Sequence, residues 1–120
     1  MKVLVDASAI IEWRAGNPNA IRAINESENI NISSLSQYEV LVGDESEKVK
    51  DFFRNFPLLP FTARDSLKAV NIYRALAKKG KVINTMDILI AAQAFERGLT
   101  IVTKDGDFDR IKDVEVVKIE

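Results

Sequence analysis

The chain has 120 residues, which suits one domain with one hydrophobic core, and its 47% hydrophobic content is ordinary for a globular protein. It contains neither cysteine nor histidine, which excludes disulfides, catalytic triads that use histidine, and zinc sites with nitrogen or sulfur ligands. Because 17 basic and 18 acidic residues leave a net charge of −1, a polyanionic ligand would need a local basic patch or a bound cation.

The lack of cysteine favours a reducing compartment, and we expect the protein to be cytoplasmic. Asp6, Glu12 and Arg14 stand too early in the chain for a secretory signal peptide. No apolar run is long enough to span a bilayer, so we expect no association with a membrane.

The first half of the chain is predicted to contain two strands and four helices. Val3–Val5 is a short apolar run typical of a buried strand. Helix starts are predicted at Asn17-Pro18, at Ser34 in an S-x-x-Q capping box, and at Asp44, three residues before a glutamate. In chain order, we expect a strand at Lys2–Asp6, a helix at about Ala9–Arg14 ended by Gly16, a helix from Pro18, a strand at Ile30–Ile32, and helices at Ser34–Gly43 and Glu45–Asn55.

The second half is predicted to contain three strands and two longer helices. Two prolines confine the first strand to a sheet edge, Thr62 with Asp65 resembles a helix cap, and Gly98 ends the most apolar helix. In chain order, we expect an edge strand at Pro57–Phe61, a helix from Thr62 to Lys79, a helix from Asn84 or Thr85 to Gly98, a strand at Leu99–Thr103, a turn at Asp105–Asp107, a helical turn at Phe108–Ile111 and a strand at Val114–Ile119.

Strands separated by helices favour parallel pairing with right-handed crossovers. The chain has no internal repeat, low-complexity stretch or linker. We therefore predict a single α/β domain over residues 1–120, a three-layer α/β/α sandwich around a central, mostly parallel sheet of about five short strands.

Asp6 places a charge directly after the first predicted strand. In open α/β sheets, ligands bind outside the carboxyl ends of the strands, where the strand order reverses. The alternative is that Asp6 or Ser8 only caps the helix that follows.

Two further acids occupy helix positions that the apolar pattern predicts to be buried. Glu39 shares a face with Leu35, Tyr38 and Val42, at the i, i+3, i+4, i+7 spacing of a core-facing stripe, unless it extends from the edge of that stripe to water. Asp87 stands in the first turn of a helix that is apolar all round, where the alternative role is to stabilise the helix dipole by ~0.3–1 kcal/mol.

The predicted strand at Leu99–Thr103 is followed by Asp105, Asp107 and Asp109. Asp-Gly is common in turns and Asp107 suits a helix N-cap, so a purely structural role is a strong alternative. The D-x-D-x-D spacing also suggests an EF-hand, but the glycine that this loop requires would fall at Arg110 and the final glutamate at Val116.

The predicted topology brings Asp6, Glu39, Asp87 and Asp105 to one edge of the sheet. Close pairs of these carboxylates would repel by up to ~4 kcal/mol at an effective dielectric constant of about 20, so they need a cation or bound protons. A site made only of oxygen ligands favours Mg²⁺ or Mn²⁺, and with no histidine as base a metal-activated water is the expected nucleophile. Hydrolysis of phosphodiesters fits these groups best.

Four blocks of the sequence resemble the successive motifs of PIN-domain nucleases, and in particular the VapC toxins of prokaryotic toxin–antitoxin pairs. The match follows the order of the whole chain, and the third block is the most distinctive. The blocks are Val3-Leu4-Val5-Asp6-Ala7-Ser8, Ser36-Gln37-Tyr38-Glu39-Val40, Asp87-Ile88-Leu89-Ile90-Ala91-Ala92-Gln93-Ala94 and Val102-Thr103-Lys104-Asp105-Gly106-Asp107-Phe108.

The resemblance implies an endoribonuclease that depends on Mg²⁺ or Mn²⁺, acts on RNA, forms a homodimer and is inhibited by a small antitoxin protein. It implies that the acids of the metal site are Asp6, Glu39, Asp87 and Asp105, with Asp107 as an auxiliary or alternative fourth. Ser8 and Thr103 match the polar positions that support the site.

The segment from Gly43 to Pro57 departs from the family pattern, because it has room for one helix where relatives often have two. This raises a question about the antitoxin groove and the reach of the RNA-binding surface. Val49, Phe52, Phe53 and Phe56 form a helical stripe in this segment, which we expect mainly to pack in the core.

Two other functions are compatible with the sequence. A PIN-like module that binds RNA or a protein without cutting is suggested by the near-neutral charge and the shortened middle segment. A hydrolase of small phosphomonoesters is disfavoured, because such enzymes carry a strand-end Asp-x-Asp and Ser8 stands at the second position here. Lys104, Arg14 and Lys81 are candidate phosphate contacts.

Overall fold

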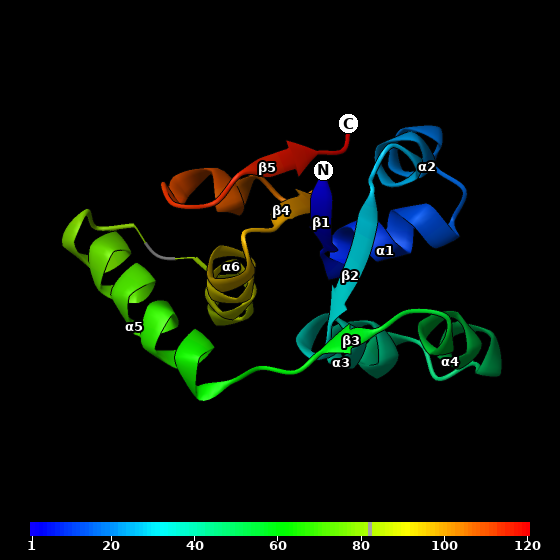
Figure 1. The fold of residues 1–120 in the computed structure, drawn as a ribbon, viewed down its shortest axis with the longest axis horizontal. Helices are drawn as coiled ribbons and strands as arrows, with labels where there is room; N and C mark the ends of the chain where they lie inside the picture. The colour runs from blue at the N-terminus through cyan, green and yellow to red at the C-terminus, as the bar shows by residue number, and fades with distance from the viewer. Residues whose placement is uncertain (82) are drawn as a thin grey trace.

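The computed structural model describes residues 1–81 and 83–120 and has the predicted α/β/α architecture (Figure 1). The strands are β1 (Lys2–Val5), β2 (Asn29–Ser33), β3 (Leu58–Leu59), β4 (Thr100–Thr103) and β5 (Val116–Lys118). The helices are α1 (Ala7–Arg14), α2 (Pro18–Asn25), α3 (Ser34–Gly43), α4 (Glu47–Arg54), α5 (Ala63–Lys78), α6 (Thr85–Arg97) and the short 3₁₀ helix η1 (Gly106–Arg110). None of the helices in this part of the chain combines the length and apolarity needed to cross a membrane.

The five strands form one parallel sheet in the order β3-β2-β1-β4-β5. β1 lies at the centre, with Val3 opposite Ile30 of β2 and Thr100 of β4. The chain moves outward from β1 to β3 on one side and from β4 to β5 on the other, so the strand order reverses between β1 and β4. The short β3 lies at an edge, as its flanking prolines predict.

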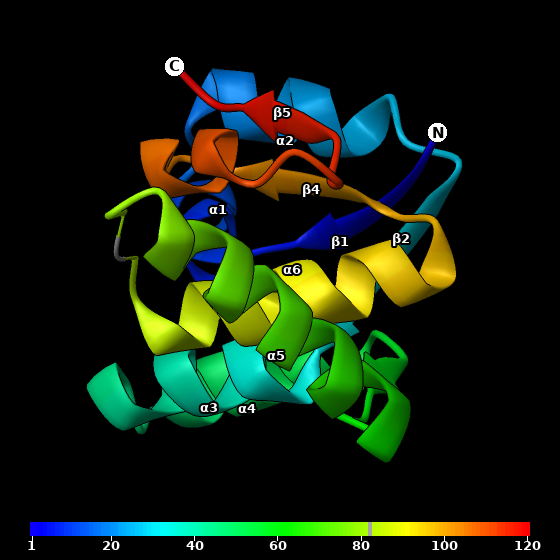
Figure 2. The same ribbon diagram turned by 90° about the vertical axis from the view of Figure 1, so that its left-hand side faces the viewer.

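Each face of the sheet has its own hydrophobic core, because successive side chains of a strand point to opposite faces. Leu4 of β1 packs with the apolar sides of α5, α6 and η1, whereas Val3 and Val5 pack with α1, α2, α3 and α4. Figures 1 and 2 show α5 and α6 on one side of the strands and α1 and α2 on the other. That residues 1–120 make up one domain stays a prediction.

The segment between Gly43 and Pro57 contains one helix, α4, as expected. Val49 and Phe53 are buried, and Phe52 and Phe56 pack in the half-buried layer above them. The Trp13 ring of α1 lies 5.2 Å from the ring centroid of Phe52 and 5.3 Å from that of Phe56. This aromatic cluster attaches α4 to α1, so the stripe serves the core.

Two predicted helix starts and one predicted helix cap are displaced by one or two residues. α1 begins at Ala7 instead of Ala9, with Asp6 at the N-cap position. Ser33 caps α3 in place of Ser34, and Ser46 caps α4 in place of Asp44, because their hydroxyls accept hydrogen bonds from Leu35 N and Val49 N. The last strand also starts later than predicted, at Val116.

The α3 face was predicted wrongly. Tyr38 and Val42 are 62% and 67% exposed, whereas Ser36 and Val40 are the buried residues of this helix. α3 contacts α1 on one side and α6 on another, so it crosses the end of the sheet and does not lie flat on one face. The partly exposed stripe consequently carries Glu39 to the edge of the core, not into its centre.

An ion pair fixes α6 against α5. Both oxygens of the Asp65 carboxylate, which is fully buried, accept hydrogen bonds from the Arg97 guanidinium, at 2.8 and 3.1 Å. Asp65 also accepts from Thr62 N at 2.8 Å, in the capping box predicted at the start of α5. One turn earlier on the same face of α6, Gln93 accepts a hydrogen bond from Ser33 and donates to the Leu59 carbonyl, so the helix that begins near Asp87 is also tied to the ends of β2 and β3.

We predict that Asp65→Asn lowers the free energy of unfolding by about 2–3 kcal/mol, because Arg97 loses its charged partner and the capping box is weakened. Burial alone would raise the pKa of Asp65, but the hydrogen bonds from Arg97 and Thr62 outweigh it and hold the pKa below its usual value. This stabilisation is therefore complete above the unfolded-state pKa of aspartate and is lost as the pH falls through the lowered pKa.

Urea unfolding at several pH values measures both effects. Asp51→Asn is the matched control, because Asp51 pairs with Arg54 on the exposed surface of α4 and its loss should cost no more than about 0.5 kcal/mol. Equal stability of the two variants at neutral pH would contradict the assigned role of Asp65.

Candidate active site

The centre of the acidic edge is Asp6, which follows β1 directly and is only 4% exposed. Its Oδ2 accepts hydrogen bonds from the hydroxyls of Ser8 and Thr103, each at 2.9 Å. The same hydroxyls accept hydrogen bonds from the backbone N–H groups of Lys104 and Asp105, both at 3.0 Å. The ends of β1 and β4 are thus joined through one carboxylate, whose orientation is fixed before any ligand binds.

Asp87, Asp105 and Asp107 form a second group of acids beside Asp6. One carboxylate oxygen of each lies within 4.8 Å of the others. Asp87 is in the first turn of α6, Asp105 is the N-cap of η1 and accepts from Asp107 N at 2.9 Å, and Asp107 follows in the first turn of η1. Asp105 therefore both caps η1 and belongs to the acid group.

Glu39 of α3 approaches this edge from the side of β2. Its Oε1 is buried and has no hydrogen-bond partner within the described residues. Burial raises the pKa of Glu39, and the negative charge of Asp6 raises it further. A buried carboxylate oxygen without a donor costs free energy, so Glu39 is arranged for a positively charged or proton-donating group that the chain itself does not supply.

Crowding of the acids is strongest at Asp87. Burial, the charges of Asp6 and Asp105, a hydrogen bond with Asp105 and the charge of Glu39 together raise the pKa of Asp87 to about 8. A carboxyl group in this state holds a proton at neutral pH unless a cation replaces it. Asp87 therefore lies within electrostatic range of Asp6, Glu39 and Asp105.

The donor set fits a hard divalent cation. The clustered acids offer only oxygen atoms as ligands, their carboxylates are crowded, and Glu39 Oε1 lacks a hydrogen-bond partner among the residues that the structure describes. Mg²⁺ and Mn²⁺ favour such ligands. Asp109 is exposed and is not among the three clustered acids, so one member of the D-x-D-x-D run stays outside the site.

Two of the basic residues suggested as phosphate contacts are engaged by acids. Lys104 Nζ lies 2.7 Å from Glu12 Oε1, and Arg14 lies 3.5 Å from Asp44 Oδ2. Lys81 is exposed beyond the end of α5. These partners could not be found from the sequence, because 92 residues separate Lys104 from Glu12.

Sequence reasoning also missed Ser36. It is fully buried in α3, one turn before Glu39, and its hydroxyl has no hydrogen-bond partner in the described part of the chain. The sequence could have indicated Ser36 as a polar residue on the buried face of α3, but that face was predicted wrongly.

Comparison with known proteins gives consistent matches. The family model described as "PIN domain" matches residues 3–114. The "Ribonuclease VapC3" of Methanocaldococcus jannaschii is 33% identical over 92 residues, which are 77% of this chain and 97% of that protein. The "tRNA(fMet)-specific endonuclease VapC" of Salmonella typhimurium is 27% identical over 130 residues, covering 97% of this chain and 96% of that protein.

Solved structures share the fold. The crystal structure of VapBC2 from Rickettsia felis bound to a promoter DNA fragment has a chain that matches with a TM-score of 0.85 and 21% identity, covering 100% of both chains. A chain of DNA-bound VapBC from Salmonella typhimurium also matches with a TM-score of 0.85, at 23% identity over 98% of each chain. At such identities the likeness establishes the fold alone.

The pKa of Asp87 predicts how stability depends on pH in metal-free protein. Since this pKa is raised to about 8, its contribution is fully present below the unfolded-state pKa and is lost as the pH rises through the folded-state value. We expect stability in EDTA to fall by about 1 kcal/mol or more between pH 5 and about 8.5, less than the full shift implies because part of the site faces solvent.

Thermal and urea unfolding in EDTA test this expectation. Asp87→Asn should remove most of the decrease with pH, and Mg²⁺ or Mn²⁺ should stabilise the wild type more at pH 8 than at pH 5. Asp109→Asn is the control and should follow the wild-type profile. A wild-type profile as flat as that of Asp87→Asn would contradict the crowding of these acids.

Proposed function

This chain belongs to the PIN-domain family, and from that premise we propose that it is a metal-dependent endoribonuclease, the toxin of a VapBC-type toxin–antitoxin pair. The observation that carries the proposal is the convergence of acids from β1, α3, α6 and η1 on one edge of the sheet. Relatives named as VapC ribonucleases support the reaction class. We propose a cytoplasmic location for the same reason.

We propose distinct roles for the acids. Asp6, Asp87, Asp105 and Asp107 offer the oxygens that would hold Mg²⁺ or Mn²⁺. When bound, such an ion supplies positive charge that activates water and offsets the charge of the phosphodiester. Ser8 and Thr103 act through Asp6, because their hydroxyls fix the direction of its carboxylate.

Glu39 is proposed as the proton acceptor. Its Oε1 accepts no hydrogen bond from residues 1–81 or 83–120 and its pKa is raised, so the carboxylate is a stronger base than one in water. In the reaction, the oxygen of water forms a bond to phosphorus and its proton moves to Glu39 Oε1. The bond from phosphorus to the leaving ribose oxygen then breaks; this oxygen keeps the electron pair and takes a proton from water, which separates the two RNA fragments.

We also propose that the protein forms a homodimer and binds a small antitoxin. Two groups of exposed apolar side chains are available for such partners. One comprises Ile11 of α1 with Tyr38 and Val42 of α3, and the other comprises Leu67, Val70 and Tyr73 on α5. Analytical ultracentrifugation tests self-association, and co-purification with the product of the adjacent reading frame tests the antitoxin.

We predict that purified protein cleaves RNA only when Mg²⁺ or Mn²⁺ is present, and that Asp6→Asn lowers the rate by about 100-fold or more. EDTA should abolish cleavage, and added Mn²⁺ should restore it. Cleavage is measured on single-stranded and structured RNA by gel electrophoresis, with a generic phosphomonoester as a negative control.

Asp109→Asn is the matched control, because it removes a neighbouring aspartate that lies outside the acid group. It should retain wild-type activity. Undiminished cleavage by Asp6→Asn would overturn the proposed site. An absence of cleavage by wild type, together with a site that stays empty in Mn²⁺ calorimetry, would favour the alternative of a PIN-like module that binds RNA or protein without cutting.

A further inference from the structure

Two basic side chains that were candidate phosphate contacts already face carboxylates. Lys104 is paired with Glu12 and Arg14 with Asp44. A cation at the acid group would serve one phosphate of a substrate, but the phosphates of neighbouring nucleotides need positive charge from another part of the surface.

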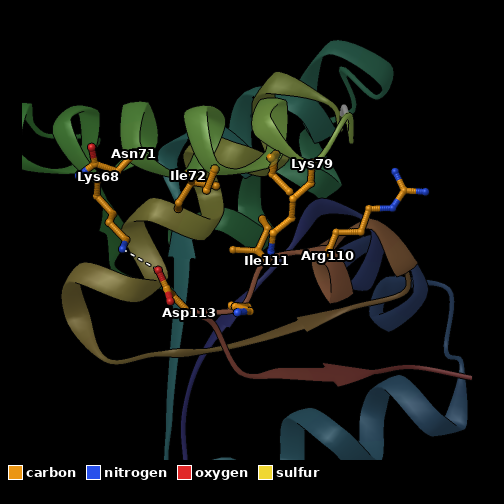
Figure 3. A pocket seen from close by; sticks show the side chains of 10 residues that line it. Lys68, Asn71, Ile72, Lys79, Arg110, Ile111 and Asp113 are labelled. Atoms are coloured by element: carbon orange, nitrogen blue, oxygen red, sulfur yellow. Dashed lines mark hydrogen bonds and ion pairs between the residues drawn. The ribbon is translucent and has the colours of Figure 1, made fainter.

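A cleft of about 140 Å³ lies between residues 68–79, which are α5 and its C-terminal end, and the segment Arg110–Asp113, as Figure 3 shows. Ten residues line it; four are basic and one is acidic. Its floor is apolar and is formed by the side chains of Ile72, Leu76 and Ile111. The cleft thus combines an apolar floor with a positive rim.

The two ends of the cleft differ in charge. At one end, Lys68 Nζ lies 2.9 Å from Asp113 Oδ2 and 3.6 Å from the centroid of the Phe95 ring, so its charge is neutralised locally. At the other end, Lys79 is exposed; Lys112 also lines the cleft and is exposed, and neither lysine makes an ion pair within the described residues. Figure 3 shows Lys79 and Arg110 together at this end, away from Lys68.

The positive end of the cleft adjoins the acid group. Arg110 lines the cleft, and its Nη1 lies 4.0 Å from Asp107 Oδ1. α5 ends at Lys78, and α6 begins two residues before Asp87, so both helices present these ends to the same side of the molecule. A strand with one phosphate at the acid group can therefore place a neighbouring nucleotide beside Arg110 and Lys79.

We propose that this cleft is a second RNA subsite, which binds one unpaired nucleotide adjacent to the cleaved bond. Its phosphate contacts Lys79, Arg110 and Lys112, and its base lies against the apolar floor. A double helix could not enter, because a base must leave its stack to reach the floor. The subsite depends on the proposed ribonuclease function, and it makes unpaired RNA the preferred substrate.

The binding test uses the full chain carrying Asp6→Asn, so that RNA is not cut, and a labelled single-stranded oligoribonucleotide. Fluorescence anisotropy gives the dissociation constant over a range of salt concentrations. Lys79→Glu with Lys112→Glu should weaken binding by about tenfold or more and reduce the salt-dependence slope by about 0.7 for each lost phosphate contact. Lys79→Arg with Lys112→Arg should bind as tightly as the parent.

The matched control is Arg22→Glu with Lys48→Glu, which makes the same change in net charge at exposed positions on α2 and α4. It should weaken RNA binding by no more than about twofold, because it changes only the overall electrostatic field of the protein. Equal losses in the two double variants would overturn the subsite and leave only nonspecific attraction. Unchanged RNA affinity in the cleft variant would also overturn it, and would favour a protein ligand for the cleft.

Kinetics separate this subsite from the cleavage site. In a chain with the native Asp6, the cleft variant should raise KM for a long single-stranded RNA with little change in kcat, because its residues do not touch the reacting phosphate. The rise in KM should be smaller for a dinucleotide, because it has no phosphate beyond the one that is cleaved. If wild type cuts no RNA, the ribonuclease proposal fails, while the anisotropy comparison still decides whether the cleft binds RNA.

Discussion

Mutual repulsion among carboxylates at one edge of the sheet is the constraint that the rest of this structure must overcome. Asp6 and Asp87 are 4% and 7% exposed, so water screens their charges poorly. The fold holds them in place by other means. Hydroxyls of Ser8 and Thr103 donate to Asp6, and the Arg97–Asp65 pair holds α6 against α5, at the far end of the helix from Asp87. These interactions stabilise the fold enough to keep the acids close together, although their repulsion is unfavourable without a bound cation or extra protons.

The order of the strands explains why the acids meet. β1 is the central strand, and the chain runs outward from β1 to β3 on one side and from β4 to β5 on the other, so the strand order reverses where the carboxyl ends of β1 and β4 lie side by side. Asp6 N donates to the Val102 carbonyl at 2.9 Å, which continues the pairing of β1 and β4 to the edge. Asp105 follows two residues after β4, and α6 precedes β4 along the chain. Parallel pairing therefore delivers separate parts of the sequence to one place.

Local patterns were enough to predict the parallel sheet, the capping box of Thr62 and Asp65, and the placement of Asp6 and Asp105 after strands. They failed where two neighbouring residues suit the same cap position, and where contacts with distant residues determine which face of a helix is buried. Ser33 and Ser34 are both good caps, and only the backbone geometry selects Ser33. An apolar stripe does not reveal whether the protein core or a partner covers it, so Tyr38 and Val42 were assigned to the core although they are exposed.

Separation of charge accounts for how a chain with a net charge of −1 can act on a polyanion. The net charge does not say where the individual charges lie. Here the acids gather at the ends of β1 and β4, while exposed lysines border the cleft beside α5. Without metal, the acid group repels RNA, but once it holds a divalent cation it attracts a phosphate. The cleft attracts the neighbouring phosphate whether or not the metal is bound. Because only the acid group changes sign with metal, metal should control cleavage strongly and affinity for single-stranded RNA more weakly.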